Sequence, residues 1–327
     1  MSLDADHIVD RRRMRRKLTF WRVTAIVVAA LAVVVLALGV APGRNGLVGV
    51  GTPYIARITI EGLIQSNADR VKALDKLARA SAVKAVIVHI NSPGGTTAGS
   101  EQLHDALKRI KAKKPIVTVV DGLAASGAYI AAIASDHIVA QSSSLVGSIG
   151  VLFQYPNFSE LMKTVGVSME SIKSSPLKAS PNPFEPTTPE ARAAIQSIVM
   201  DAYAWFRDLV RDNRKMSDGQ LNQVADGRVF TGRQGLELKL VDQLGEEKEA
   251  IDWLAKQRGV PANLPVRDYE LESRFSELPF LHAAAARALD MLGLSALARQ
   301  VADWGTVRAL QRLNLDGLLA LWHPSAN

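Results

Sequence analysis

The sequence has no cysteine in any of its 327 positions. Disulfide bonds, thiolate nucleophiles and zinc sites built on thiolates are therefore excluded. The same absence leaves an oxidising compartment open to the chain, since it has no thiol to protect. Any catalytic chemistry must come from other side chains. The length suffices for one large domain with appendages or for two smaller domains.

Nucleotide-binding motifs are also missing. The glycine-containing stretch HINSPGGTTAG, residues 89–99, fits neither G-x-G-x-x-G nor G-x-x-x-x-G-K-[ST]. Two glycines that follow a buried strand and precede a helix let the backbone turn sharply with its N–H groups exposed. The stretch therefore predicts either an anion-binding turn, for a phosphate or an oxyanion, or a plain strand-to-helix turn, and it disfavours nucleotide binding.

Positive charge is concentrated at the start of the chain. The net charge is +7, and the first 22 residues hold seven arginines and lysines against three aspartates. A basic run of this kind is typical of nucleic-acid binding or of the cytoplasmic side of a membrane protein. The apolar segment that follows it favours the membrane, so we expect no nucleic-acid partner.

That apolar segment, Val23–Val40 (VTAIVVAALAVVVLALGV), carries no charge. Eighteen helical residues extend for about 27 Å, close to the hydrocarbon thickness of a bilayer. Phe20 and Trp21 stand where interfacial aromatic residues belong, and the arginines before them favour a cytoplasmic N-terminus. The segment predicts one transmembrane helix, with everything after Val40 across the membrane. A cleaved signal peptide is the alternative, but Pro42-Gly43 makes a poor cleavage site.

After this segment, apolar strand-like runs alternate with amphipathic stretches of 10–16 residues. Strands separated by helices of that length are typical of parallel βαβ units, so we expect an α/β fold. A proline-rich loop at 174–189 and a long amphipathic helix at 190–216 follow. The predicted organisation is a basic cytoplasmic tail (1–22), a transmembrane anchor (23–40), a stalk (41–53), a folded domain large enough for an enzyme (54–269) and an amphipathic helical C-terminal tail (270–327).

One serine stands at a strand-to-helix corner. In VVDGLAASGAYIAA, residues 119–132, Ser126 precedes a glycine where an apolar strand gives way to a helix. The glycines at 94 and 95 follow the preceding strand, and corners of consecutive parallel strands meet at the same edge of the sheet. Tight packing of a helix on a sheet explains small residues there equally well, so the corner alone does not establish a nucleophile.

A serine nucleophile needs a base. None of the six histidines stands where a catalytic triad needs it, and none occurs between His137 and His282. Lysine replaces histidine in Ser-Lys enzymes, but burial must lower its pKa before it can act as a base. Lys178 is a candidate because small residues and prolines flank it and no acid occurs from 171 to 184. A solvated loop lysine is an equally good reading of the same residues.

Five motifs occur together in order behind the apolar segment: NSPGG, ASGAYIAA, GSIGV, IKSSPLKAS and DGRVFTGRQG followed by LVDQLG. In this combination the chain, over about 54–254, resembles the short form of the signal peptide peptidase A family. These are Ser-Lys serine proteases of the Clp protease/crotonase superfamily, in peptidase family S49. The resemblance implies a Clp protease/crotonase-like βαβ superhelix behind the N-terminal transmembrane helix.

Carried over position by position, the resemblance implies Ser126 as nucleophile, Lys178 as general base and Ser148 as the hydroxyl that orients the lysine. It implies an oxyanion hole at the N–H groups of Gly95 and Gly127, and neither metal nor cofactor. Remnant signal peptides are the implied substrates of this endopeptidase. The proline-rich stretch after Lys178 makes the placement of that residue less direct than that of Ser126.

The resemblance also implies a homo-oligomeric ring, with eight subunits as the expected number, in which neighbouring chains complete each site. The expected location is the bacterial inner membrane, with the catalytic domain on its outer side. Three other readings remain. A histidine-using Clp protease is disfavoured by the histidine positions, an acyl-CoA enzyme of the crotonase type by the apolar anchor, and a catalytically inactive membrane scaffold by the complementary roles of Ser126 and Lys178.

Overall fold

The computed structural model of the chain describes residues 20–22, 24, 28, 51–271, 287 and 318–321. The chain divides into two units, Met1–Thr52 and Pro53–Asn327, and the fold described here is that of the second. The predicted transmembrane helix at 23–40 lies outside the described residues, apart from Thr24 and Val28. Among the described residues, no helix combines the length and the apolar character that crossing a bilayer requires.

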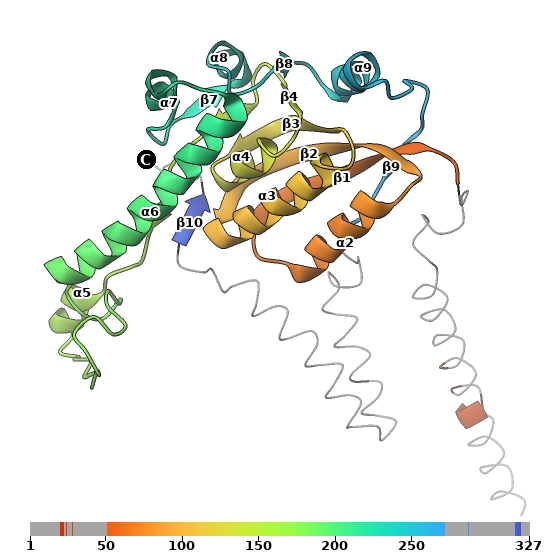
Figure 1. Cartoon of the computed structure of the whole chain (residues 1–327). Helices are drawn as coiled ribbons and strands as arrows, with labels where there is room; N and C mark the ends of the chain where they lie inside the picture. The colour runs from red at the N-terminus through yellow and green to blue at the C-terminus, as the bar shows by residue number, and fades with distance from the viewer. Residues whose placement is uncertain are drawn as a thin grey trace, which may run out of the picture. The chain divides into compact units, whose positions relative to one another are not determined.

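The predicted α/β fold is confirmed: parallel strands and helices alternate through the first half of the second unit (Figure 1). β1 pairs with β2, β2 with β3, and β3 with β4, all in parallel. The helices between them make the three βαβ crossovers. In chain order the elements are β1 (Tyr54–Ile64), α2 (Ala68–Arg79), β2 (Val83–Thr96), α3 (Thr97–Lys111), β3 (Ile116–Ala125), α4 (Gly127–Ala132) and β4 (His137–Ala140).

Shorter strands extend this sheet. β5 (Leu145–Gly147) continues beside the end of β3 in parallel and pairs antiparallel with β7 (Val229–Thr231). β8 (Gln243–Leu244) and β9 (Val266–Asp268) add parallel to β4 and β1. β10 (Leu318–Leu321) pairs antiparallel with both β2 and β6 (Leu152–Phe153). The ends of β2, β3 and β5 therefore meet at one edge of the sheet.

Side-chain caps fix where the crossover helices begin. The Asn67 side chain accepts hydrogen bonds from the N–H groups of Asp69 and Arg70, both at 3.0 Å, and so starts α2. Thr96 caps α3 by accepting from Gly99 N at 3.1 Å. Such caps satisfy N–H groups that the first helical turn leaves without partners. The end of β2 is thereby joined to the start of α3 with no intervening loop.

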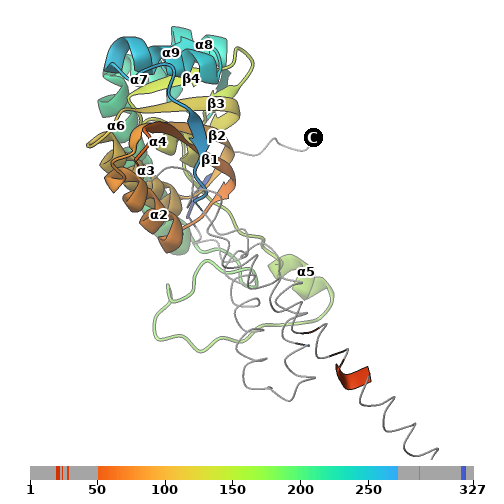
Figure 2. The same ribbon diagram turned by 90° about the vertical axis from the view of Figure 1, so that its right-hand side faces the viewer.

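Two apolar cores hold the sheet between helices. The larger lies on the face covered by α2, α3 and α4, and it includes Phe206 and Val210 of the long helix α6 (Pro189–Arg214). The smaller lies on the opposite face under α9 (Glu247–Arg258), where Ala250 and Leu254 pack on the strands. α9 stands apart from α2 and α3 in both views (Figures 1 and 2). Because both faces are covered, the central strands are mostly apolar, as parallel strands usually are.

Several elements lie outside what the sequence pattern indicated. The short helices α5 (Ser159–Thr164) and α7 (Asp218–Val224), which the pattern did not indicate, precede and follow α6. A further short helix, α8 (Gly232–Glu237), begins directly after β7. The predicted helical tail at 270–327 lies outside the described residues except for 270, 271, 287 and 318–321. Of these, 318–321 form strand β10, because β2 and β6 offer backbone partners on both of its sides.

Candidate active site

Ser126 occupies a sharp turn between β3 and α4. Its backbone has φ 54° and ψ −117°, a conformation that a residue with a side chain rarely adopts. Its N–H donates to Gly147 O at 2.8 Å, and its carbonyl accepts from the N–H groups of Tyr129 and Ile130. The side chain is 1% exposed, and its Oγ donates to Gly150 O at 3.4 Å. Strained backbone at a buried hydroxyl is typical of functional positions.

Ser148 lies beside Ser126 because β3 and β5 run together. Ala125 pairs with Gly147, so the next residue of each strand, Ser126 and Ser148, leaves the sheet at the same edge. Ser148 also has a positive φ, 52°, and its N–H donates to Arg228 O at 2.8 Å. Both serines are buried. The structure thus brings together two of the residues that the sequence singled out.

Gly95 reaches the same edge at the end of β2, where Ser92 pairs with Ala124 of β3. It pairs with Ile64 of β1, and an added Cβ would meet Ile64 O at 1.9 Å. The close approach of the two strands therefore requires glycine here whatever the role of the Gly95 N–H. Gly127 is the first residue of α4, where a helical N–H has no partner within the helix.

Lys178 is in a different place. It is exposed, in a turn in which its own N–H donates to Ser175 O at 3.0 Å. The segment that follows α5 and leads to α6 lies away from α4 in both views (Figures 1 and 2). In the described part of the chain no hydrogen bond joins Lys178 to Ser126. Within the described residues of one chain, Lys178 is therefore neither joined to Ser126 nor buried.

The same segment carries a second lysine, Lys173, which is ion-paired, whereas Lys178 is not paired with a carboxylate among the described residues. Lys173 forms an ion pair with Glu185, the first acid after the acid-free stretch. The hydrogen bond from Lys173 lowers the pKa of the Glu185 carboxyl. Glu185 is thereby already engaged, and within the described residues no carboxylate pairs with Lys178.

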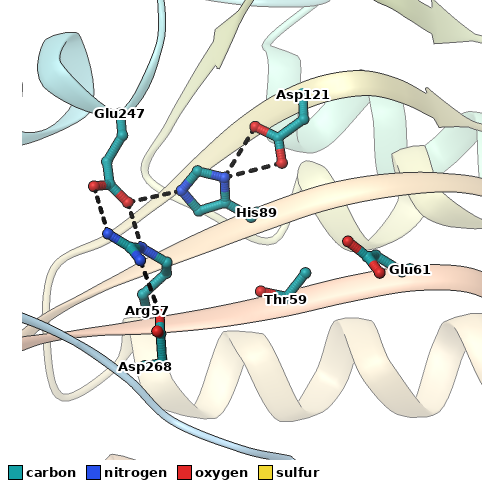
Figure 3. A pocket seen from close by; sticks show the side chains of 7 residues that line it. All are labelled: Arg57, Thr59, Glu61, His89, Asp121, Glu247 and Asp268. Carbon is teal, nitrogen blue, oxygen red and sulfur yellow. Dashed lines mark hydrogen bonds and ion pairs between the residues drawn. The ribbon is translucent and has the colours of Figure 1, made fainter.

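One strand histidine, His89, is not available as a base. His89 of β2 lies between two carboxylates (Figure 3). Its Nδ1 is 2.9 Å from both Asp121 oxygens, and its Nε2 is 2.9 Å from Glu247 Oε2. With both ring nitrogens engaged, His89 has none left for Ser126, whose Oγ bonds Gly150 O instead. The expectation that no histidine triad forms around Ser126 is consistent with this geometry.

His89 belongs to a polar network that sequence reasoning missed. Arg57 of β1 donates to both oxygens of Glu247, at 2.6 and 2.8 Å, and to Asp268 at 2.9 Å. Burial opposes ionisation of Glu247, but hydrogen bonds from Arg57 and His89 outweigh it and lower the pKa of the carboxyl. The network lines an open pocket of about 460 Å³ with Thr59 and Glu61 (Figure 3). The sequence did contain a signal for this network: Arg57, Thr59 and Glu61 stand at every second position of β1, so their side chains share one face of the sheet.

The fold and the turn define the class: an α/β protein with a buried serine in a strained strand-to-helix turn beside a glycine-bordered strand end. Two family models match the chain, that of peptidase family S49 over residues 108–261 and that of Clp protease over 57–144. The turn at Ser126 lies within both ranges.

Curated relatives agree with these matches. Two are named "putative protease": one from Synechocystis sp., 37% identical over 63% of this chain and 75% of the relative, and one from Methanocaldococcus jannaschii, 35% identical over 62% and 65%. "Putative signal peptide peptidase SppA" of Enterococcus faecium is 37% identical over 57% of this chain and 54% of its own length. The chain therefore spans less than two thirds of some of these relatives.

The chain belongs to peptidase family S49, and its class is that of the serine peptidases. The expected family is confirmed. Among solved structures, a ClpP1 point mutant from Listeria monocytogenes matches 58% of this chain and 91% of its own, with 16% identity and a TM-score of 0.40.

Proposed function

We propose that this chain is a membrane-anchored serine endopeptidase that uses a Ser126–Lys178 dyad and degrades remnant signal peptides and other apolar peptides. The observation that carries the proposal is the turn at Ser126. A buried hydroxyl is held there in strained backbone, and both ring nitrogens of His89 are bound to carboxylates. We take Lys178 as the base because the family resemblance implies it, and among the described residues no carboxylate pairs with it.

In the proposed reaction, Ser126 Oγ attacks the peptide carbonyl carbon while the neutral amine of Lys178 takes the hydroxyl proton. The carbonyl oxygen becomes an oxyanion, which accepts hydrogen bonds from the N–H groups of Gly95 and Gly127. Protonated Lys178 then gives its proton to the leaving amine as the C–N bond breaks. Water attacks the acyl carbon and loses a proton to Lys178; the ester C–Oγ bond then breaks, Lys178 returns the proton to Ser126 Oγ, and the acid product leaves. Ser148 orients the lysine.

A second copy of the chain is proposed to supply the lysine, in a homo-oligomeric ring for which we expect eight subunits. The segment that carries Lys178 lies away from α4, the helix that begins directly after Ser126. It exposes large apolar side chains, including Leu161 at 61% and Val165 at 63%, together with Val167, Met169 and Ile172. Contiguous exposed apolar surface is typical of an interaction site. Burial against a neighbour would also remove water from the amine, as a lysine base requires.

Residues 23–40 are proposed to anchor this ring in a bacterial inner membrane, with residues 1–22 in the cytoplasm and the catalytic domain outside it. The uncharged run of eighteen residues and the basic residues before it support the topology. An enzyme fixed at the bilayer surface is well placed for apolar peptides that remain in or near the membrane.

Two alternative functions differ from the proposed peptidase in what they expect of Ser126. A catalytically inactive scaffold would keep the fold and the membrane segment without a reactive serine. An acyl-CoA enzyme of the crotonase type would use the glycine N–H groups on a thioester and leave Ser126 unreactive. The strained, buried hydroxyl of Ser126 favours the peptidase over both.

Fluorophosphonate labelling and peptide hydrolysis together test the proposal. We expect the full chain to be labelled at Ser126 and to cleave an apolar fluorogenic peptide. Ser126→Ala and Lys178→Ala should each lower kcat/KM by at least about 10³-fold, as loss of a nucleophile or base does in serine proteases. Ser148→Ala should lose less, because the hydroxyl only orients the lysine.

The matched control is Lys163→Ala, which removes an exposed lysine of α5 that pairs only with its helical neighbour Glu160. Its activity should stay within about twofold of the unaltered chain, since exposed pairs contribute little. Full activity of Lys178→Ala would refute the dyad. Absence of both labelling and hydrolysis in the unaltered chain would favour the scaffold, and hydrolysis of an acyl-CoA without labelling would favour the crotonase-type enzyme.

A further inference from the structure

The turn at 226–228 lies against the loop at 147–150, which carries Ser148. β7 begins directly after this turn and pairs antiparallel with β5, which ends where the loop begins. The pairing extends one residue beyond the two strands, because the Ser148 N–H donates to Arg228 O at 2.8 Å. An added Cβ at Gly150, the last residue of the loop, would lie 3.5 Å from the Cα of the glycine in the turn. The turn therefore contacts both the middle and the end of this loop.

The same loop contacts Ser126. The carbonyl of Gly147 accepts from the Ser126 N–H at 2.8 Å, and that of Gly150 accepts from Ser126 Oγ at 3.4 Å. Between them Ser148 has a φ of 52°, which a residue with a side chain keeps only where its surroundings hold it. Ser148 is 6% exposed, and within the described residues its hydroxyl makes no hydrogen bond. This hydroxyl is therefore available to the amine of Lys178.

One side chain, that of Asp226, fixes the shape of the turn. Asp226 Oδ1 accepts from the Arg228 N–H at 3.2 Å, and its Oδ2 accepts from Arg228 Nε at 2.7 Å. The residue between them is Gly227, whose φ of 90° suits a glycine. The hydrogen bond from the Arg228 side chain lowers the pKa of the Asp226 carboxyl, so that the carboxylate is ionised at neutral pH. A single carboxylate thus joins the two ends of the turn.

Stability alone does not account for this carboxylate. The side chains of Arg228 and Asp226 are 65% and 40% exposed, and ion pairs at such exposure contribute little to stability. The effect on geometry is larger, because an aspartate that accepts from the N–H two residues further on restricts the backbone to a turn. The carbonyl at the end of that turn is the one that accepts from the Ser148 N–H. A change in the turn would therefore displace Ser148.

We propose that Asp226 is a positioning residue: its carboxylate fixes the turn, and the Arg228 carbonyl then holds Ser148 where its hydroxyl orients Lys178. The inference rests on the proposed peptidase function. In this arrangement Asp226 contacts neither the substrate nor the reacting atoms, so its effect passes through Ser148. Loss of the carboxylate should therefore slow the chemical step and leave the binding of the peptide unchanged.

Hydrolysis of the apolar fluorogenic peptide by full chains carrying Asp226→Ala, Asp226→Asn or Arg228→Ala tests the proposal. Asp226→Ala removes both acceptors. We expect its kcat to fall about tenfold with KM unchanged, since a misplacement of about 1 Å costs up to about 100-fold. Asp226→Asn keeps an acceptor for the Arg228 N–H and should retain kcat within about threefold. Arg228→Ala leaves both backbone groups of the turn in place and should do the same.

A double-mutant cycle with Ser148→Ala tests whether Asp226 acts through Ser148. If it does, the double variant should have the kcat of Ser148→Ala alone, because the hydroxyl that Asp226 positions is already absent. Losses that multiply in the double variant would refute the proposal, as would an unchanged kcat in Asp226→Ala. Asp208→Ala is the matched control. Asp208 forms an exposed ion pair with Arg211 within α6, at 2.9 Å, and its removal should leave kcat unchanged.

Amide hydrogen exchange separates this inference from the proposed function. The Ser148 N–H keeps its partner only while the turn holds the Arg228 carbonyl in place, so its exchange should be about tenfold faster in Asp226→Ala. Mass spectrometry of a peptic fragment that contains residues 145–150 measures this rate, and Asp208→Ala should leave it unchanged. Faster exchange supports the positioning of Ser148 even if the unaltered chain hydrolyses no peptide. An unchanged rate in Asp226→Ala refutes it, whatever the activity.

Discussion

Gly95 has a structural requirement that is independent of catalysis. An added Cβ would lie 1.9 Å from Ile64 O, a backbone atom of the paired strand, and cannot be accommodated by a side-chain movement. We expect Gly95→Ala to lower the free energy of unfolding by about 3 kcal/mol, at the upper end for overpacked sites. Urea unfolding monitored by circular dichroism measures this change.

Gly219 provides the comparison for that variant. It lies in α7 with no heavy atom within 4 Å of an added Cβ. Gly219→Ala should therefore raise the free energy of unfolding by up to about 1 kcal/mol through helix propensity. If Gly95→Ala were as stable as the unaltered chain, the packing requirement for glycine at this position would be refuted.

The positions of single residues could be predicted from the sequence where their neighbours come from consecutive strands and helices. Ser126 and Gly95 could be placed at one sheet edge because consecutive parallel strands end together. The environment of Lys178 could not be predicted, because it depends on which distant segments fold back over the loop, and among the described residues none buries it. The engagement of His89 by Asp121 and Glu247 was missed for the same reason, since Glu247 comes from a helix 158 residues further along the chain.

At the scale of elements, the network around Glu247 attaches α9 to β1 and β2. The hydrogen bonds from Arg57 and His89 lower the pKa of this carboxyl in the folded chain, while the unfolded value is about 4.3. A lowered folded pKa gives stabilisation that is fully present above the unfolded pKa and is lost as the pH falls through the folded value. The attachment of α9 should therefore weaken only in acid.

Glu247→Gln tests this attachment. We expect a free energy of unfolding about 1 kcal/mol lower at pH 7, since the partly exposed pair is screened by solvent. The difference from the unaltered chain should shrink as the pH falls below about 4, where the glutamate itself becomes protonated. Thermal unfolding between pH 3 and 7 measures it.

Glu237→Gln controls for the loss of one negative charge, because Glu237 is an exposed residue of α8. It should give no pH-dependent difference in unfolding. A Glu247→Gln variant that matches this control at every pH would show that the network contributes nothing to the attachment of α9.

Helices and strands were predicted best where the hydrophobic pattern repeats over many residues. The alternation of strands and helices after the apolar segment agrees with the structure, and the helix expected at 190–216 is α6, Pro189–Arg214. β9 and β10 were not predicted, because three or four apolar residues carry too little periodicity to separate a strand from a helix. Their conformation depends on distant partners on β1, β2 and β6.

At the scale of the whole molecule, the proposed sharing of sites makes a mixing prediction. Ser126→Ala and Lys178→Ala chains should each be inactive alone, yet regain activity when coassembled, because some neighbours pair an intact Ser126 with an intact Lys178. Random pairing gives up to about one quarter of the sites in a closed ring of like subunits. Peptide hydrolysis after mixing, with native mass spectrometry to verify mixed rings, measures the recovery.

The control for that experiment is Ser126→Ala alone, taken through the same mixing procedure. If the mixed rings form but stay inactive, each dyad lies within one chain, and the segment carrying Lys178 must then move toward its own Ser126. Recovery above this control is expected only when the lysine crosses between chains.

The pairing of β1 with β9 also has a consequence for how the protein is made. Arg57 and Asp268, joined by a hydrogen bond, lie 211 residues apart in the chain. At about 5 to 20 residues per second, a ribosome needs roughly 10 to 40 s to make the chain between them. For that time the outer edge of β1 has no strand partner, and an unpaired edge is prone to wrong pairing. The newborn chain therefore depends on delayed folding, or on protection by another protein, until β9 has emerged.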